Sequence, residues 1–213
     1  MKLRDFKIIG FDLDGTIIES LDGIYESYEH SVTKINLKVF DKILIASKIG
    51  PQIDSFFNKL YPNNKDLLNE YIYHFRSYYL NKGYKKTKLK DGMLSLLKML
   101  YSNSHELFIV TNKSSESTNL ILNELDISKY FSNTISINKK NKHLNDKSSN
   151  INFLTKNYEK SLYIGDTRED LDASISAGIS FIGLEDGYGF FDKKKQTETI
   201  QFCKSAKKVI KLY

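Results

Sequence analysis

Two short acidic segments of the chain carry residue types and spacings that could bind a divalent cation. In the first, Asp12 and Asp14 are separated by one residue and are followed by Gly15 and Thr16. Two carboxylates this close would repel each other and any anionic ligand unless a cation lies between them. A hard ion with oxygen ligands meets this need, and Mg²⁺ fits best where phosphate oxygens complete its shell. A solvated turn followed by a helix cap is the competing interpretation of this run alone.

The second acidic segment covers residues 165–170, where Asp166 and Asp170 are four residues apart at the start of a predicted helix. Side chains at this spacing share one face of a helix. Asp166 or Thr167 could also cap the helix, with acidic residues in its first turn, and this interpretation does not exclude metal binding. If both acidic pairs lie on one edge of a sheet, a metal site is favoured over two unrelated caps.

The elements that would position these acids are short β-rich runs that alternate with longer helical patterns. The runs cover residues 7–11, 107–111, 134–137, 161–164 and 180–184, and the helical patterns cover 115–125, 148–158, 170–177 and 196–210. This alternation predicts an α/β fold with a Rossmann-like core of about five parallel strands flanked by helices. Ligands bind at the carboxyl ends of parallel strands, so we expect Asp12, Thr111 and Asp166 to meet at one edge.

The connection between the first two strands, residues 12–106, is far longer than an ordinary crossover. Apolar side chains recur at helical spacing in two stretches of it. They are Leu21, Ile24, Tyr28, Val32 and Ile35 in the first stretch, and Leu67, Tyr71, Phe75 and Tyr78 in the second. We therefore expect an inserted α-helical bundle over residues 17–86, and a core domain made of residues 1–16 and 87–213.

The composition is that of a globular protein, with 40% hydrophobic and 27% charged residues among 213. The single cysteine, Cys203, can form no internal disulfide and indicates a reducing compartment. The charged amino terminus argues against a signal peptide, and no apolar run approaches the roughly 18 residues that span a bilayer. We therefore expect a cytoplasmic protein without a membrane partner, either a monomer or a homodimer.

The net charge is +6, and lysines gather near residues 85–90, 139–147 and 193–195. No aromatic-interleaved basic motif accompanies these clusters, so solvated surface lysines are favoured over nucleic-acid binding. A mild positive field also favours an anionic substrate.

Three motifs, in this order, resemble those of the haloacid dehalogenase superfamily. Phe-Asp-Leu-Asp-Gly-Thr at residues 11–16 is similar to the first family motif, Val-Thr-Asn-Lys at 110–113 to the second, and Gly-Asp-Thr-Arg-Glu-Asp at 165–170 to the fourth. Ala-Gly-Ile at residues 177–179 is similar to the usual sequel. The resemblance covers nearly the whole chain and points to the phosphoglycolate-phosphatase-like branch, which carries a helical C1-type cap.

The resemblance implies a Mg²⁺-dependent phosphatase that acts on a small phosphomonoester. Asp12 would attack phosphorus to form an aspartyl-phosphate. Asp14 would protonate the leaving oxygen and later activate water, as general acid and then general base. The ion would be held by the Asp12 carboxylate, the Asp14 backbone carbonyl and Asp166, with Asp170 ordering a metal-bound water.

The resemblance also implies groups that hold the phosphoryl oxygens. These are the Thr111 hydroxyl, the Asn112 backbone N–H and a lysine that precedes a helix in the third family motif. The usual Lys-Pro pair of that motif is absent. We expect Lys147, directly before the helical pattern, to be this lysine, with Lys142 as its rival.

The substrate stays open among phosphoglycolate, sugar or polyol phosphates and nucleotide-like monophosphates, all of them small phosphorylated metabolites. The turn at Gly50, Pro51 and Gln52 is a candidate for contact with the leaving group. A mere turn between two helices explains these residues equally well.

Other activities of the superfamily require residues that this chain lacks. A dehalogenase would not need the acid at Asp14, and a phosphonatase would carry a lysine within residues 17–33, which contain none. A sugar phosphomutase would have a histidine near Ile24, where the nearest is His30. A catalytically degenerate binding protein would have lost Asp12 or Asp14. Hydrolysis is therefore favoured, with a phosphomutase and a binding protein as alternatives.

Overall fold

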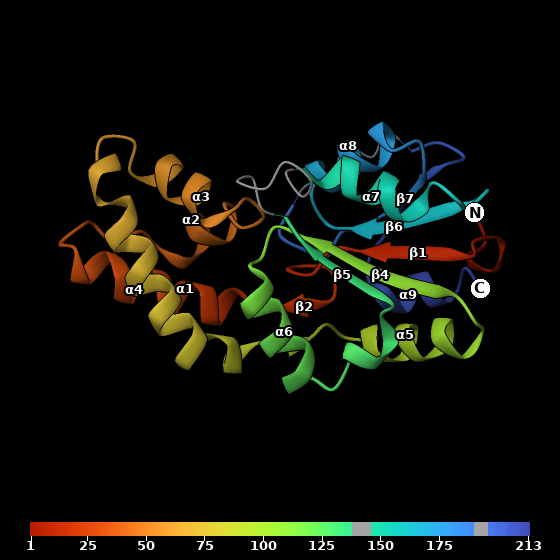
Figure 1. The fold of residues 1–213 in the computed structure, drawn as a ribbon, viewed down its shortest axis with the longest axis horizontal. Helices are drawn as coiled ribbons and strands as arrows, with labels where there is room; N and C mark the ends of the chain where they lie inside the picture. The colour runs from red at the N-terminus through yellow and green to blue at the C-terminus, as the bar shows by residue number, and fades with distance from the viewer. Residues whose placement is uncertain (138–145, 190–195) are drawn as a thin grey trace. The chain divides into compact units, whose positions relative to one another are not determined.

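The computed structural model describes residues 1–137, 146–189 and 196–213 and divides into two compact units (Figure 1). Met1–Ile18 and Leu89–Tyr213 form the first unit, and Glu19–Lys88 forms the second. The assignment of these units as a catalytic core and a cap stays a prediction. Within the described ranges, we find no helix with the length and apolar character needed to cross a membrane.

A six-stranded sheet with the order β5-β4-β1-β6-β7-β8 forms the centre of the first unit. Its strands are β1 (Ile8–Phe11), β4 (Glu106–Thr111), β5 (Asn133–Ser136), β6 (Ser161–Gly165), β7 (Ser180–Leu184) and β8 (Ile200–Cys203). Every neighbouring pair is parallel. The predicted α/β fold is confirmed, and the two strands that carry the acidic motifs, β1 and β6, are neighbours.

The sixth strand corrects one of our expectations. Residues 196–210 are predicted as a helix, but β8 occupies Ile200–Cys203, and only Ala206–Ile210 forms a helix, α9. Ile200 and Phe202 alternate with polar Gln201, which suits a strand, and pairing with β7 supplies the hydrogen bonds that a short segment lacks alone. The pattern of apolar residues over a segment of four residues does not distinguish a strand from a helix.

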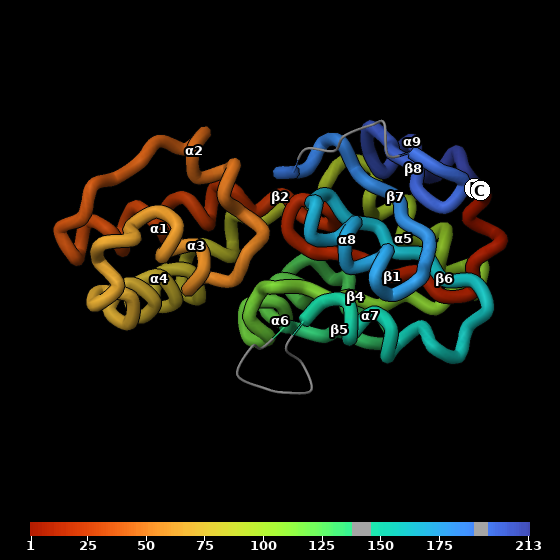
Figure 2. The backbone as a smooth tube through the Cα atoms, turned by 90° about the horizontal axis from the view of Figure 1, so that it is seen from above, coloured from red at the N-terminus to blue at the C-terminus, as the bar shows by residue number. Residues whose placement is uncertain are grey.

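Helices connect the strands and cover the sheet. They are α5 (Met93–Ser102), α6 (Ser115–Glu124), α7 (Lys147–Thr155), α8 (Arg168–Ser176) and α9. Helices α7 and α8 lie together on one face, and α5 and α9 lie together on the other (Figure 1). The two chain ends lie side by side (Figure 2), where the Leu3 N–H donates to the Leu212 carbonyl at 3.0 Å.

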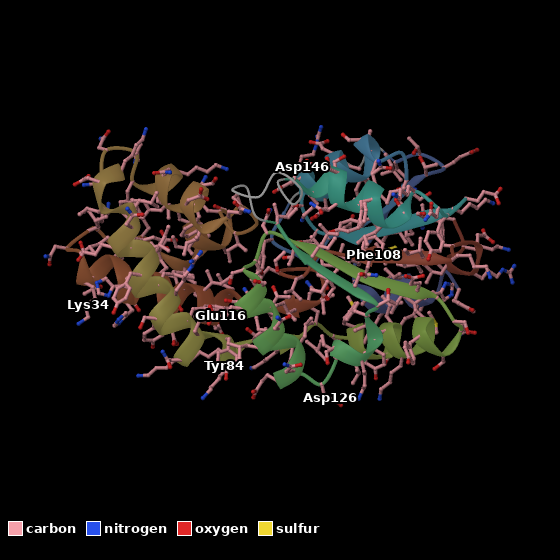
Figure 3. The ribbon with its side chains drawn as sticks, in the orientation of Figure 1. Lys34, Tyr84, Phe108, Glu116, Asp126 and Asp146 are labelled. Carbon is pink, nitrogen blue, oxygen red and sulfur yellow. The ribbon has the colours of Figure 1, made fainter. Side chains whose placement is uncertain are left out.

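The sheet is buried on both faces, as its apolar strands require. Phe108 lies inside the core (Figure 3) and packs beside Tyr163 around Gly10 of the central strand β1. A Cβ at Gly10 would lie 2.2 Å from the Phe108 ring, so only glycine allows this approach. The packing fixes β1 between its neighbours, with Phe11 paired to both Ile109 and Ile164.

The second unit is the predicted helical bundle. It contains α1 (Leu21–Lys34), α2 (Lys42–Ala46), α3 (Ile53–Leu60) and α4 (Leu68–Asn81), and α1 packs along α4. Its core is aromatic, and the hydroxyls of Tyr28 and Tyr61 share a hydrogen bond of 2.7 Å. The short strands β2 (Ile18–Glu19) and β3 (Lys88–Leu89) pair in a two-stranded sheet.

Candidate active site

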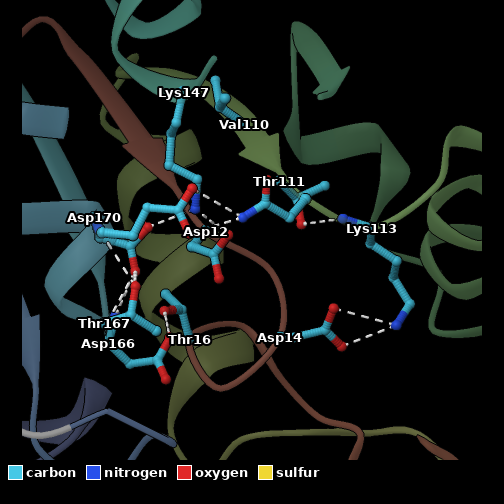
Figure 4. Close-up of polar contacts among 12 residues, drawn as sticks. Asp12, Asp14, Thr16, Val110, Thr111, Lys113, Lys147, Asp166, Thr167 and Asp170 are labelled. Atoms are coloured by element: carbon cyan, nitrogen blue, oxygen red, sulfur yellow. Dashed lines mark hydrogen bonds and ion pairs between the residues drawn. The ribbon is translucent and has the colours of Figure 1, made fainter. Parts of the chain in front are cut away.

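Three strand ends bring the predicted site residues to one edge of the sheet. Asp12 directly follows β1, Thr111 ends β4, and Asp166 directly follows β6. These strands are adjacent, with β1 in the middle. The Asp12 backbone N–H donates to the Ile164 carbonyl at 2.9 Å, which continues the pairing to the site itself. The expected meeting of side chains at this edge is visible in Figure 4.

Three carboxylates form the centre of the site. Oxygen atoms of Asp12, Asp166 and Asp170 all lie within 4.8 Å of one another, and all three residues are buried. Each offers hard oxygen ligands, and together they bring more negative charge than a buried site sustains alone. The donor set therefore fits the predicted Mg²⁺.

Lys147 lies among these acids. Its ammonium contacts Asp12 Oδ1 at 2.9 Å and Asp170 Oδ1 at 2.6 Å, and the lysine is 5% exposed. It is the first residue of α7, whose N-terminus is capped by Asp146 through the Ser149 N–H. The cap begins the helix at the point from which Lys147 reaches the site (Figure 4). The rival, Lys142, lies outside the described residues.

The charges of the site are strongly coupled. Burial raises the pKa of Asp12 well above its usual value, Lys147 opposes this rise, and Asp170 and Asp166 add to it. Burial and Asp170 raise the pKa of Asp166 to about 7. Burial disfavours the charged form of Lys147, but Asp12 and Asp170 outweigh it and raise the pKa of the lysine well above the usual range. The Lys147 ammonium thus contacts two of the three acids, and a divalent cation would supply the positive charge that the third lacks.

Asp170 serves the fold and the site at once. Its Oδ2 accepts hydrogen bonds from the Thr167 N–H at 2.9 Å and the Thr167 hydroxyl at 2.6 Å, in a capping box that begins α8. Its Oδ1 contacts Lys147. The capping interpretation and the site interpretation of residues 165–170 are therefore both present in the same side chain.

Asp14 points to a different partner. Both of its carboxylate oxygens contact the Lys113 ammonium, at 3.0 and 3.2 Å, and both side chains are largely buried. Lys113 was not among the predicted site residues, although it is the last residue of the second motif. The Thr111 hydroxyl accepts from the Lys113 N–H at 3.2 Å, and the Asn112 amide contacts Glu169 at 3.0 and 3.1 Å.

Two further contacts to Asp166 were missed from the sequence. The Thr16 hydroxyl donates to Asp166 Oδ1 at 2.8 Å, and the Tyr188 N–H donates to Oδ2 at 2.7 Å. Thr16 closes the first motif, so its place in that run was a usable signal. Tyr188 follows β7 at the same edge of the sheet, but only the strand order shows this.

The predicted specificity residues lie in the second unit. Gly50, Pro51 and Gln52 connect α2 to α3, and Gln52 is the residue before the first turn of α3. Their contact with a leaving group, like the roles assigned to the other site residues, stays a prediction.

We expect Lys147→Met to destabilise the metal-free protein. The change keeps an aliphatic stem but leaves Asp12 and Asp170 without their counter-ion, which typically costs about 3–5 kcal/mol for a buried pair. Urea unfolding of the metal-free protein measures it. Lys129→Met, which removes an exposed pair with Asp126, is the matched control and should change little. An equal, small loss in both variants would contradict the buried charge balance.

The metal-free protein should lose stability as the pH rises from about 4 to about 7. The folded state keeps a proton on Asp166 up to a pKa of about 7, whereas the unfolded chain releases it near the ordinary aspartate value. The folded state therefore binds more protons in this window, and raising the pH favours unfolding. Urea unfolding in EDTA measures the slope, and Asp166→Asn should flatten it. The same slope in both proteins would contradict this assignment.

The chain is similar to known proteins over most of its length. Residues 9–184 match the family described as haloacid dehalogenase-like hydrolase. A phosphoglycolate phosphatase from Aquifex aeolicus is 28% identical over 81% of each chain, and a 5'-nucleotidase from Pseudomonas aeruginosa is 24% identical over 91% of this chain and 89% of its own.

A solved structure shares the fold. It is a haloacid dehalogenase-like family hydrolase from Streptococcus pneumoniae, which superposes with a TM-score of 0.84 at 24% identity over 98% of this chain and 99% of its own. Because the family match spans well over half of the chain and includes β1, β4, β6 and β7, the protein belongs to the haloacid dehalogenase-like hydrolases.

Proposed function

We propose that this chain is a Mg²⁺-dependent phosphatase that hydrolyses a small-molecule phosphomonoester through an aspartyl-phosphate at Asp12. The observation that carries the proposal is the burial of Asp12 at the end of the central strand, against Lys147 and beside Asp166 and Asp170. A carboxylate held in this way is oriented for attack and lies where a cation would counter its charge. The family membership supports the same chemistry.

Asp12, Asp166 and the Asp14 backbone carbonyl would hold the ion, and Asp170 would order a water molecule of its coordination shell. When bound, Mg²⁺ would neutralise phosphate charge, so that an anionic carboxylate can approach an anionic ester. Lys147 would keep its ammonium among these acids and add a second positive charge beside the phosphoryl group.

The bond changes follow from the two carboxylates of the first motif. A carboxylate oxygen of Asp12 would bond to phosphorus while the ester P–O bond breaks, and Asp14 would give its proton to the leaving oxygen. Asp14 would then take a proton from water as that water attacks the aspartyl-phosphate, which restores Asp12 and releases phosphate. The Thr111 hydroxyl and the Asn112 N–H would hold the phosphoryl oxygens.

The substrate class is a small phosphorylated metabolite. Two relatives are named phosphoglycolate phosphatase and 5'-nucleotidase, and both names describe small phosphate esters. We assign residues 19–88 the role of a cap, which would exclude large substrates and water from the site. Gly50, Pro51 and Gln52 of this cap would contact the leaving group. The single buried Cys203 supports a cytoplasmic location.

The parent protein should release phosphate from p-nitrophenyl phosphate in the presence of Mg²⁺ and not in EDTA. Asp12→Asn should lower turnover by about three orders of magnitude or more, because it removes the nucleophile. Asp172→Asn is the matched control, since Asp172 lies on α8 with an exposed side chain paired to Arg168. Absence of Mg²⁺-dependent release by the parent would refute the function, and a folded, active Asp12→Asn would refute the nucleophile.

A panel of phosphate esters should separate small from large substrates. We expect phosphoglycolate, sugar phosphates and nucleoside monophosphates to include the ester with the highest kcat/KM, and phosphoproteins to be poor substrates. Comparable kcat/KM for a phosphoprotein would contradict the proposed cap.

A further inference from the structure

We propose that residues 187–189, here called the backbone clamp, position Asp166 for metal binding. The inference rests on the Mg²⁺ site of the proposed function and extends it to a segment that carries none of the recognised motifs. The clamp follows β7, which pairs with β6 through Gly183 and Gly165, so it reaches the residue that follows β6. The clamp contributes the backbone N–H of Tyr188 to the site. Its two glycines leave the space that the clamp needs to approach Asp166 closely.

The clamp and the first motif hold the two oxygens of Asp166 from different directions. The Tyr188 N–H donates to Oδ2 at 2.7 Å, and the Thr16 hydroxyl donates to Oδ1 at 2.8 Å. Asp166 itself is fully buried. Two donors on opposite oxygens prevent rotation of the carboxylate, yet each oxygen keeps a further lone pair for a cation.

Gly187 and Gly189 of the clamp allow its backbone to lie close to Asp166. A Cβ at Gly187 would lie 2.2 Å from the Asp166 Cβ, and a Cβ at Gly189 would lie 2.3 Å from the Asp166 carbonyl oxygen. Neither glycine has a positive φ, so the requirement is space and not backbone conformation. A side chain at Gly187 would push the Tyr188 N–H away from the carboxylate.

Lys90 anchors the clamp to the first motif. Its ammonium donates to the Asp186 carbonyl at 2.5 Å and pairs with Asp186 Oδ1 at 3.1 Å. Its backbone N–H donates to the Ile17 carbonyl at 3.0 Å. Lys90 therefore ties the residue before the clamp to the residue after Thr16, and both donors to Asp166 belong to one anchored unit.

The test is the affinity for Mg²⁺ alone, measured by isothermal titration calorimetry on the intact metal-free chain. Gly187→Ala should raise the Kd by about 10-fold or more, the usual effect of losing a hydrogen-bond partner behind a metal ligand. Gly178→Ala is the matched control. Gly178 has a φ of +70° and nothing within 4 Å of its Cβ, so the change should lower the melting temperature and leave the Kd at the parent value.

Lys90→Met provides a second variant if Gly187→Ala does not fold. Loss of a cation near an acidic site would by charge alone tighten Mg²⁺ binding, whereas a loosened clamp weakens it. A higher Kd therefore supports the inference, and an equal or lower Kd overturns it.

The outcomes separate this inference from the proposed function. If the parent binds no Mg²⁺, the metal requirement of the proposed function fails and the clamp fails with it. If the parent binds Mg²⁺ and a folded Gly187→Ala binds it equally well, only the clamp is overturned.

Discussion

Asp12 and Asp170 contact the Lys147 ammonium, and Asp166 lies beside these two acids, in a part of the protein that solvent barely reaches. Like charges are costly in such a place, and one ammonium does not balance three carboxylates. The arrangement persists only if strong packing elsewhere holds the side chains together. The first unit supplies that packing with a parallel sheet buried on both faces and helices on each side.

The sheet order decides which side chains share the site. The central strand β1 delivers Asp12, and its neighbour β6 delivers Asp166, while Gly10 lets the Phe108 and Tyr163 rings close around β1. The site and the core therefore depend on the same strand positions. The glycine inside the sheet and the aspartate at its edge therefore both depend on the position of β1.

Several side chains perform structural and chemical tasks together. Asp170 begins α8 through its capping box and contacts Lys147 with its other oxygen. Lys147 begins α7, and Asp14 is held by Lys113 from the loop that follows β4. Helix starts and strand ends thus give the site a fixed geometry, which electrostatic catalysis needs before any ligand arrives.

The class of fold and the candidate site residues of the acidic motifs could be read from the sequence alone. Residue types at fixed short spacing, Asp12 with Asp14 and Asp166 with Asp170, are local properties, and so is the alternation of strands with helices. The contacts between residues far apart in the chain required the folded structure. The second motif indicated the neighbourhood of Lys113 but not its contact with Asp14, and no motif indicated the contact of Tyr188 with Asp166, because both contacts depend on strand order. The strand β8 was wrongly predicted as part of a helix for the same reason, because it is stabilised by hydrogen bonds to β7, a separate part of the chain.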